Sequence, residues 1–167
     1  DNFPDNHRVK LYILEKNSGA CVARNRGIKC SKGKYVAFLD SDDEYCKEKI
    51  QKQIDKLEKF NLDLCACDYY QYDEYLNRKL IKTKPGSRME VLSELLYCNF
   101  VTTGTLIGRR KCFVDIQFDE NLPRYQDWDC IKHIVWILLR NHYCYNIVKK
   151  IVYLHQQGIK KHWRRWS

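Results

Sequence analysis

The chain has 167 residues, of which 44% are hydrophobic and 31% are charged. This length and composition suit one soluble globular domain with a substantial core. The longest apolar stretch, residues 131–139, is interrupted by Lys132 and His133, which excludes a bilayer span there. The net charge of +9 indicates an anionic partner, such as nucleotide phosphates, nucleic acid or an acidic membrane surface; a solvated basic tail is the alternative.

Strands and helices are predicted in alternation along the chain. Apolar alternation or continuous apolar runs favour strands over residues 9–13, 35–39, 62–70, 101–107 and 145–154. Apolar residues spaced three or four apart favour helices over residues 20–28, 50–60, 87–96 and 127–139. Residues 77–85 are polar and basic, which predicts an edge strand or a loop. The alternation predicts an α/β fold with a mixed or mostly parallel sheet.

The nine cysteines do not have the spacing of a metal site or a disulfide framework. No two of them form a Cys-x-x-Cys pair, and several lie within apolar patterns, for example Cys65, Cys67 and Cys130. We interpret them as small buried hydrophobic residues, which predicts a reducing, cytoplasmic location.

Three carboxylates follow the strand predicted at residues 35–39, in the sequence Asp40-Ser41-Asp42-Asp43. Clustered ionised carboxylates repel one another, and a divalent cation with a preference for oxygen ligands compensates them well. Ligands also bind at the carboxyl ends of strands in open α/β sheets. A metal site that grips phosphate is therefore one reading; a solvated turn that caps the following helix is the other.

Three segments together resemble family 2 glycosyltransferases, which are inverting enzymes with the GT-A fold. The first runs from Asn17 to Gly27, the second from Gly33 to Asp43, and the third from Phe118 to Asp129. The resemblance covers nearly the whole chain and weakens after Leu154. It implies a Rossmann-like mixed sheet flanked by helices, a nucleotide-sugar donor, and Mn²⁺ or Mg²⁺ as cofactor.

The resemblance also assigns the donor side of the site. Asp40-Ser41-Asp42 falls on the family's DxD motif, in which the first acid contacts the ribose region and the later acid binds the metal. Asp43 is adjacent and is expected to support the metal or the donor sugar. Arg24 falls where the family often places a basic residue near the nucleotide. His155 lies near a point where some relatives have a histidine that binds metal or phosphate; a surface or core histidine is the more common outcome.

On the acceptor side, Asp127 matches the family's catalytic base. A carboxylate placed there accepts the proton of the acceptor hydroxyl as that oxygen attacks, and one displacement inverts the sugar carbon. The preceding residue is Gln126, whereas the family has Glu. From the residues alone, a helix N-terminal acid stabilised by the helix dipole would be favoured for Asp127; the resemblance favours the base.

The resemblance lacks one part, because the family's first strand, helix and second strand have no counterpart before residue 9. We therefore expect a partial catalytic domain at residues 1–155, inactive or weakly active by itself, and a basic, aromatic tail at residues 156–167. The expected partners are a nucleotide-sugar donor such as a UDP-sugar, a saccharide or lipid-linked acceptor, and an anionic membrane surface on the cytoplasmic side.

Two alternatives remain open at this point. A metal-binding nucleic-acid domain of the topoisomerase-primase type also places a DxD after a strand, with Glu15 as its additional acid, and the positive charge would suit it. That reading gives no role to residues 24–27 or to Asp127, so nucleic acid is not the expected partner. The other alternative is a non-catalytic remnant of a glycosyltransferase.

Overall fold

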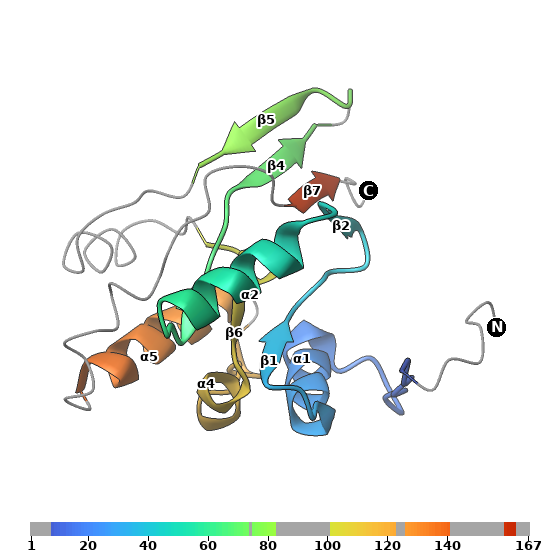
Figure 1. Ribbon diagram of the computed structural model, residues 1–167. Helices are drawn as coiled ribbons and strands as arrows, with labels where there is room; N and C mark the ends of the chain where they lie inside the picture. Colours follow the sequence, from blue (N-terminus) through green and yellow to red (C-terminus); the bar gives the residue numbers. More distant parts are fainter. Residues whose placement is uncertain (1–7, 74, 83–100, 123–125, 141–158, 163–167) are drawn as a thin grey trace.

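The structure is a computed structural model, which describes residues 8–73, 75–82, 101–122, 126–140 and 159–162. Its strands form two small sheets (Figure 1). Sheet A has the order β1 (Tyr35–Ala37), β6 (Ile107–Arg109) and β3 (Leu64–Cys65), and both of its pairings are antiparallel. Sheet B has the order β2 (Asp43–Tyr45), β7 (Ile159–His162), β4 (Tyr69–Tyr72) and β5 (Arg78–Ile81). Among the strands of the described residues, β4 and β7 form the one parallel pairing.

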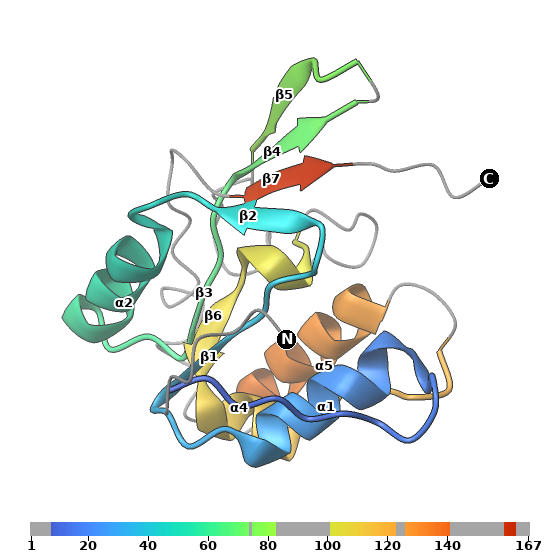
Figure 2. The same ribbon diagram turned by 90° about the vertical axis from the view of Figure 1, so that its right-hand side faces the viewer.

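Helices cover both faces of sheet A, as Figures 1 and 2 show. On one face lies α2 (Lys49–Lys59); on the other lie α1 (Gly19–Cys30), α4 (Arg110–Asp115) and α5 (Gln126–Arg140). Within the described residues, no helix is long and apolar enough to cross a membrane. A short 3₁₀ helix, η1 (Thr103–Thr105), precedes β6.

Neighbouring side chains of β3 point to opposite faces of sheet A, and both of them are buried. Leu64 packs with α1 and α4 in a core that also contains Phe38, Phe113 and Phe118. Cys65, the next residue, packs on the other face in a second core with Leu57 of α2. On the side of the first core, Gly108 of β6 has no room for a Cβ atom, because the side chains of Leu64 and Phe113 occupy that space.

The structure confirms the predicted mixed α/β class and the helices α1, α2 and α5, and it corrects three strands. Residues 9–13 form no strand, and Leu11 and Ile13 are exposed. The predicted strand at 62–70 is divided into β3 and the first residues of β4, with residues 66–68 between them. The expected strand at 101–107 contains η1 at Thr103–Thr105, and β6 begins only at Ile107. The sheets are not mostly parallel.

The remaining predictions concern the segments outside the described residues, the expected edge strand and the expected C-terminal tail. The helix expected at 87–96, the strand expected at 145–154 and His155 lie outside the described residues. Residues 78–81 form the predicted edge strand, β5. Four residues of the expected tail, Ile159–His162, form β7 and pair with β2 and β4. The boundary at residue 155 stays a prediction.

Candidate functional site

The acidic residues lie on a loop that connects the two sheets. We call residues 38–45 the carboxylate loop; it follows β1 of sheet A and ends in β2 of sheet B. The Asp43 amide donates to the Asp40 carbonyl oxygen at 3.1 Å, which closes a turn around Ser41 and Asp42. Helix α2 begins only at Lys49, and its N-cap is Glu48. The carboxylates therefore do not cap that helix, which removes the simpler of the two readings.

Arg24 of α1 brings three parts of the chain together. Its guanidinium donates to Asp40 Oδ1 at 2.9 Å, and both side chains are partly buried. The other terminal nitrogen lies 3.5 Å from Gln126 Oε1, and the guanidinium carbon lies 5.5 Å from the centre of the Phe118 ring. Side chains from α1, the carboxylate loop and the start of α5 thus meet at one guanidinium.

Asn25, the next residue of α1, fixes the segment that leads to α5. Its amide nitrogen donates to the Phe118 carbonyl and to Glu120 Oε1, both at 2.9 Å. Its amide oxygen accepts from the Phe118 amide at 2.9 Å. Since Asn25 is buried, these bonds satisfy the polar atoms of its side chain, which water scarcely reaches.

Asp127 is the second residue of α5, directly after the Gln126 that contacts Arg24. Its Oδ1 atom accepts from the Trp128 amide at 2.8 Å. This position in the first turn is expected both for a base and for an acid that stabilises the helix dipole. The role of Asp127 as base therefore stays a prediction, although Asp127 follows directly the residue that contacts Arg24.

Negative charge near α1 also affects Cys21, a buried residue of that helix. Burial raises the pKa of the Cys21 thiol; Arg24 opposes this shift, and the carboxylates of Asp119, Glu120 and Asp127 add to it. Cys21 therefore stays a protonated thiol at neutral pH. The buried Cys65, Cys67, Cys112 and Cys130 likewise have raised pKa values because of burial, which agrees with their interpretation as small hydrophobic residues.

The carboxylate loop offers oxygen ligands but no complete metal cage. Asp42 is exposed and Asp43 is half-buried, whereas Arg24 already binds Asp40. Among the described residues, no group of three His, Cys, Asp or Glu side chains is placed to hold a metal ion. One or two carboxylates fit Mg²⁺ or Mn²⁺ in sites where substrate phosphates supply further oxygens. The residues present therefore fit a cation that binds together with a diphosphate.

A family model decides the relationship of the chain to known proteins. The model described as glycosyl transferase family 2 matches residues 1–116. The chain belongs to this family. The match covers α1 and the carboxylate loop, and it favours the glycosyltransferase reading over the topoisomerase-primase reading.

Curated relatives support this assignment of the family 2 chain. It is 33% identical to the amylovoran biosynthesis glycosyltransferase AmsB of Erwinia amylovora, over 75% of this chain and 44% of the relative. It is 29% identical to an uncharacterized glycosyltransferase of Haemophilus influenzae, over 85% of this chain and 57% of the relative. The chain thus spans about half the length of these relatives.

Solved structures share the fold. The family 2 chain superposes on S. aureus TarS 1–349 in complex with UDP-GlcNAc with a TM-score of 0.66 and 18% identity, over 95% of this chain and 43% of TarS 1–349. A second TarS 1–349 structure, in complex with UDP, gives a TM-score of 0.58 and 21% identity, over 88% of this chain and 41% of that one. These neighbours confirm the GT-A fold class that the sequence predicted.

Sequence reasoning selected Arg24 and Asp40 but did not predict that they bind each other. It also assigned no role to Asn25, Phe118 or Tyr45. Asn25 carried a usable signal, because a polar amide among the apolar positions of a helix needs buried partners. Tyr45 carried no comparable signal, because its hydroxyl reaches the Phe38 carbonyl oxygen only in the folded loop.

Proposed function

We propose that this chain transfers a sugar from a nucleotide-diphosphate donor to a saccharide or lipid-linked acceptor with inversion. The observation that carries this proposal is the contact of Arg24 with both Asp40 and Gln126, because it unites the donor and acceptor segments. The relatives support it: one is an amylovoran biosynthesis glycosyltransferase, and two of the TarS structures hold UDP-GlcNAc or UDP. A UDP-sugar is therefore the proposed donor.

On the donor side, Arg24 and Asp40 bind the nucleotide. Arg24 orients the Asp40 carboxylate through a charge-assisted bond, which leaves the ribose hydroxyls as partners for the remaining carboxylate lone pairs. Asp42 and Asp43, together with His155, would hold Mn²⁺ or Mg²⁺. When bound, such a cation neutralises the negative charge that develops on the departing diphosphate.

On the acceptor side, Asp127 is the general base. Its carboxylate takes the proton of the acceptor hydroxyl while that oxygen attacks the sugar carbon from the face opposite the diphosphate. Gln126 occupies the place of an acid, so Arg24 pairs with one nearby carboxylate, Asp40, and only with a neutral amide from α5. The proposal further includes a cytoplasmic location and contact of the basic C-terminal residues with an anionic membrane surface.

Calorimetry of Mn²⁺ and UDP binding to the full-length protein tests the donor site. Asp42→Ala should weaken Mn²⁺-dependent UDP binding at least tenfold, since it removes a ligand from a site with few protein ligands. Asp55→Ala, which deletes an exposed carboxylate of α2, is the matched control and should bind like the parent. Equal affinity of Asp42→Ala and the parent would sink the proposal for the metal site.

A further inference from the structure

Tyr45 closes the carboxylate loop from its far end. Its hydroxyl donates to the Phe38 carbonyl oxygen at 2.5 Å, so one hydrogen bond spans the whole segment that carries Asp40, Asp42 and Asp43. Phe38 itself is anchored in the core, with its ring 5.1 Å from that of Phe113 and 5.4 Å from that of Phe118.

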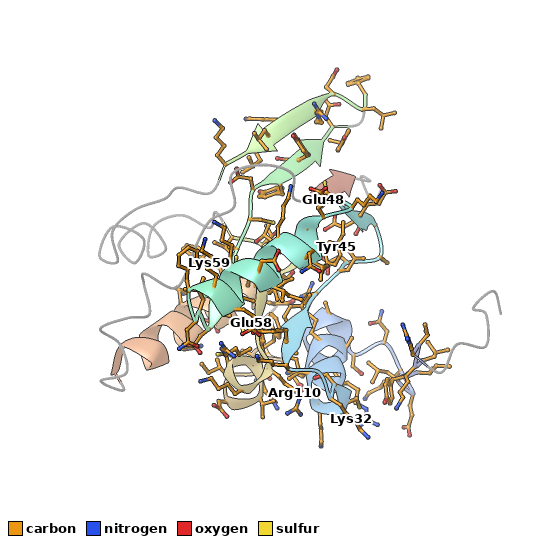
Figure 3. All side chains as sticks on the ribbon, in the orientation of Figure 1. Lys32, Tyr45, Glu48, Glu58, Lys59 and Arg110 are labelled. Carbon is orange, nitrogen blue, oxygen red and sulfur yellow. The ribbon has the colours of Figure 1, made fainter. Side chains whose placement is uncertain are left out.

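Lys49 packs against the ring of Tyr45. Its side chain is 2% exposed, and its ammonium lies 4.2 Å from the centre of the Tyr45 ring. The structure gives the Lys49 Nζ atom no hydrogen-bond partner; its polar neighbours are the face of the Tyr45 ring and the thiols of Cys46, Cys65 and Cys67. The attraction between an ammonium and the face of an aromatic ring is stronger when the ammonium is removed from water than when it is exposed. Figure 3 shows Tyr45 at the junction of β2 and α2, the helix on which Lys49 lies.

A buried ammonium without a hydrogen bond lowers stability, and a Met or Leu would fill the same volume at less cost. What Lys49 provides in return is a fixed orientation for the Tyr45 ring. We propose that Tyr45 and Lys49 are positioning residues, which hold the carboxylate loop in the geometry that binds metal and nucleotide. The proposal rests on the proposed function for its consequence, but the loop-holding contacts themselves do not depend on it.

The chain contains a close match for the Tyr45 contact at a place far from the carboxylates. Tyr35 donates its hydroxyl to Glu58 Oε1 at 2.5 Å, the same length as the Tyr45 bond. Figure 3 shows Glu58 toward the opposite end of α2 from Tyr45. Tyr45→Phe and Tyr35→Phe thus each remove one oxygen and one short hydrogen bond, and only the first lies in the loop.

Lys49 also has a match on its own helix. Lys56 lies with its ammonium 5.3 Å from the centre of the Phe60 ring, at the far end of α2. Lys49→Met and Lys56→Met therefore each remove one ammonium from the face of an aromatic ring. The first ring, that of Tyr45, belongs to the carboxylate loop, and the second, that of Phe60, does not.

Two measurements on the full-length protein and these four variants test the proposal. Hydrogen exchange of the Asp43 amide, which donates to Asp40 O, reports loop order directly. The Gly108 amide of β6 serves as the reference for global opening. Calorimetry of UDP binding with Mn²⁺ reports the consequence. Tyr45→Phe should raise Asp43 exchange relative to Gly108 about fivefold and weaken UDP binding by a similar factor, the usual loss for one hydrogen bond. Lys49→Met should change both in the same direction, and the two control variants should change neither.

Each outcome decides one part of the proposal. If Tyr45→Phe and Lys49→Met leave the Asp43 exchange ratio at the parent value, or if the control variants raise it equally, the positioning role is wrong. If the ratio rises but UDP affinity does not fall, the loop-holding contacts stand and their role in binding is overturned. If the parent itself shows no Mn²⁺-dependent UDP binding, the proposed function fails, while the exchange ratio still decides whether these two residues hold the loop.

Discussion

Arg24 shows how one residue can organise a site without contributing much stability. Its ion pair with Asp40 is partly exposed, so its net contribution to the free energy of folding is expected to be about 1 kcal/mol or less. Its directional effect is larger, because a guanidinium has donors in several fixed directions and here uses two of them on different segments. Arg24 therefore links the placement of Asp40 to that of Gln126.

Asp127 is the residue on which the chemistry of transfer is predicted to depend. Asp127→Asn keeps the shape of the side chain and removes the basic oxygen. In the full-length protein, we expect donor binding to be retained and sugar transfer to fall by about 10²–10⁴-fold, as for other lost acid–base groups. Initial rates of transfer and calorimetry of UDP binding measure the two effects separately.

Asp129 is the control for Asp127, because it lies in the same turn of α5 and has local partners. Its carboxylate oxygens lie 3.2 Å from His133 Nδ1 and 3.8 Å from Lys132 Nζ. Asp129→Asn should leave transfer near the parent rate. A large loss in Asp129→Asn with none in Asp127→Asn would move the base to Asp129. A collapse of donor binding in Asp127→Asn would make Asp127 a structural or metal residue.

Lys49 predicts an unusual dependence of stability on pH. Burial lowers the pKa of Lys49 to about 8, while the neighbouring thiols of Cys67, Cys65 and Cys46 act in the opposite direction. The folded-state pKa is thus below the unfolded value, and between about pH 8 and pH 10 the unfolded state binds more protons. The destabilising effect of Lys49 is therefore complete below pH 8 and disappears as the pH rises toward 10.

The measurement is the free energy of unfolding in urea for the parent and Lys49→Met at pH 7 and at pH 10. At pH 7 the variant should be more stable by on the order of 1–3 kcal/mol, because it replaces a buried charge with an apolar group. At pH 10 the difference should be markedly smaller. Lys56→Met corrects for the titration of other groups. A difference that is constant with pH would show that Lys49 is not the titrating residue.

At the scale of elements, α1 is attached to the acceptor side of the site by Asn25. Asn25→Ala removes three hydrogen bonds and leaves the buried backbone groups of Phe118 without partners. We expect a loss of about 2–4 kcal/mol in the free energy of unfolding, since unsatisfied buried polar groups carry their full desolvation penalty. Asn121→Ala, which removes an exposed amide bonded to Asp119, should change stability by less than about 0.5 kcal/mol. Similar losses in both variants would contradict the role of Asn25.

The elements differ in how far the sequence determines them. Helix α2 was predictable because Ile50, Ile54 and Leu57 recur at helical spacing while charged residues cover the other side, and in the structure Ile50 and Leu57 pack in one core. The strand predicted at 9–13 fails although its pattern alternates, because a strand also needs a partner and sufficient burial, and Leu11 and Ile13 have neither the burial nor a place in the ladders of either sheet. Alternation alone does not supply a neighbouring strand.

The features of the candidate site also differ in how far the sequence determines them. The order of acids after β1 was visible in the sequence because it depends only on neighbouring residues. The bonds from Arg24 to Asp40 and from Asn25 to Phe118 were not, because the second of them joins residues 93 positions apart and only the packed fold brings them together. The family resemblance compensated in part, since it named the segments that meet without stating how they bind.

At the scale of the whole molecule, the carboxylate loop crosses from one sheet to the other. It leaves β1, which is paired within sheet A, and enters β2, whose partner in sheet B is β7 near the end of the chain. Residues 43–45 pair with 159–161. The geometry of Asp43 therefore depends on a strand that lies more than a hundred residues later in the sequence.

This arrangement gives a prediction about the C-terminal residues. Truncation after residue 158 removes β7, which lies between β2 and β4, so both strands lose backbone hydrogen bonds. Hydrogen exchange of the amides in 43–45 and 69–72 should rise at least tenfold, and Mn²⁺-dependent UDP binding should weaken by a similar factor, because β2 carries Asp43. Deletion of residues 163–167 is the matched control, because it keeps β7. It should preserve both exchange and UDP binding while it lowers co-sedimentation with anionic vesicles, if the basic end contacts membranes as proposed.

If truncation after residue 158 leaves hydrogen exchange in 43–45 unchanged, β7 does not order β2. If removal of residues 163–167 alone abolishes UDP binding, the donor site includes residues beyond β7, and the carboxylate loop is not sufficient to define it.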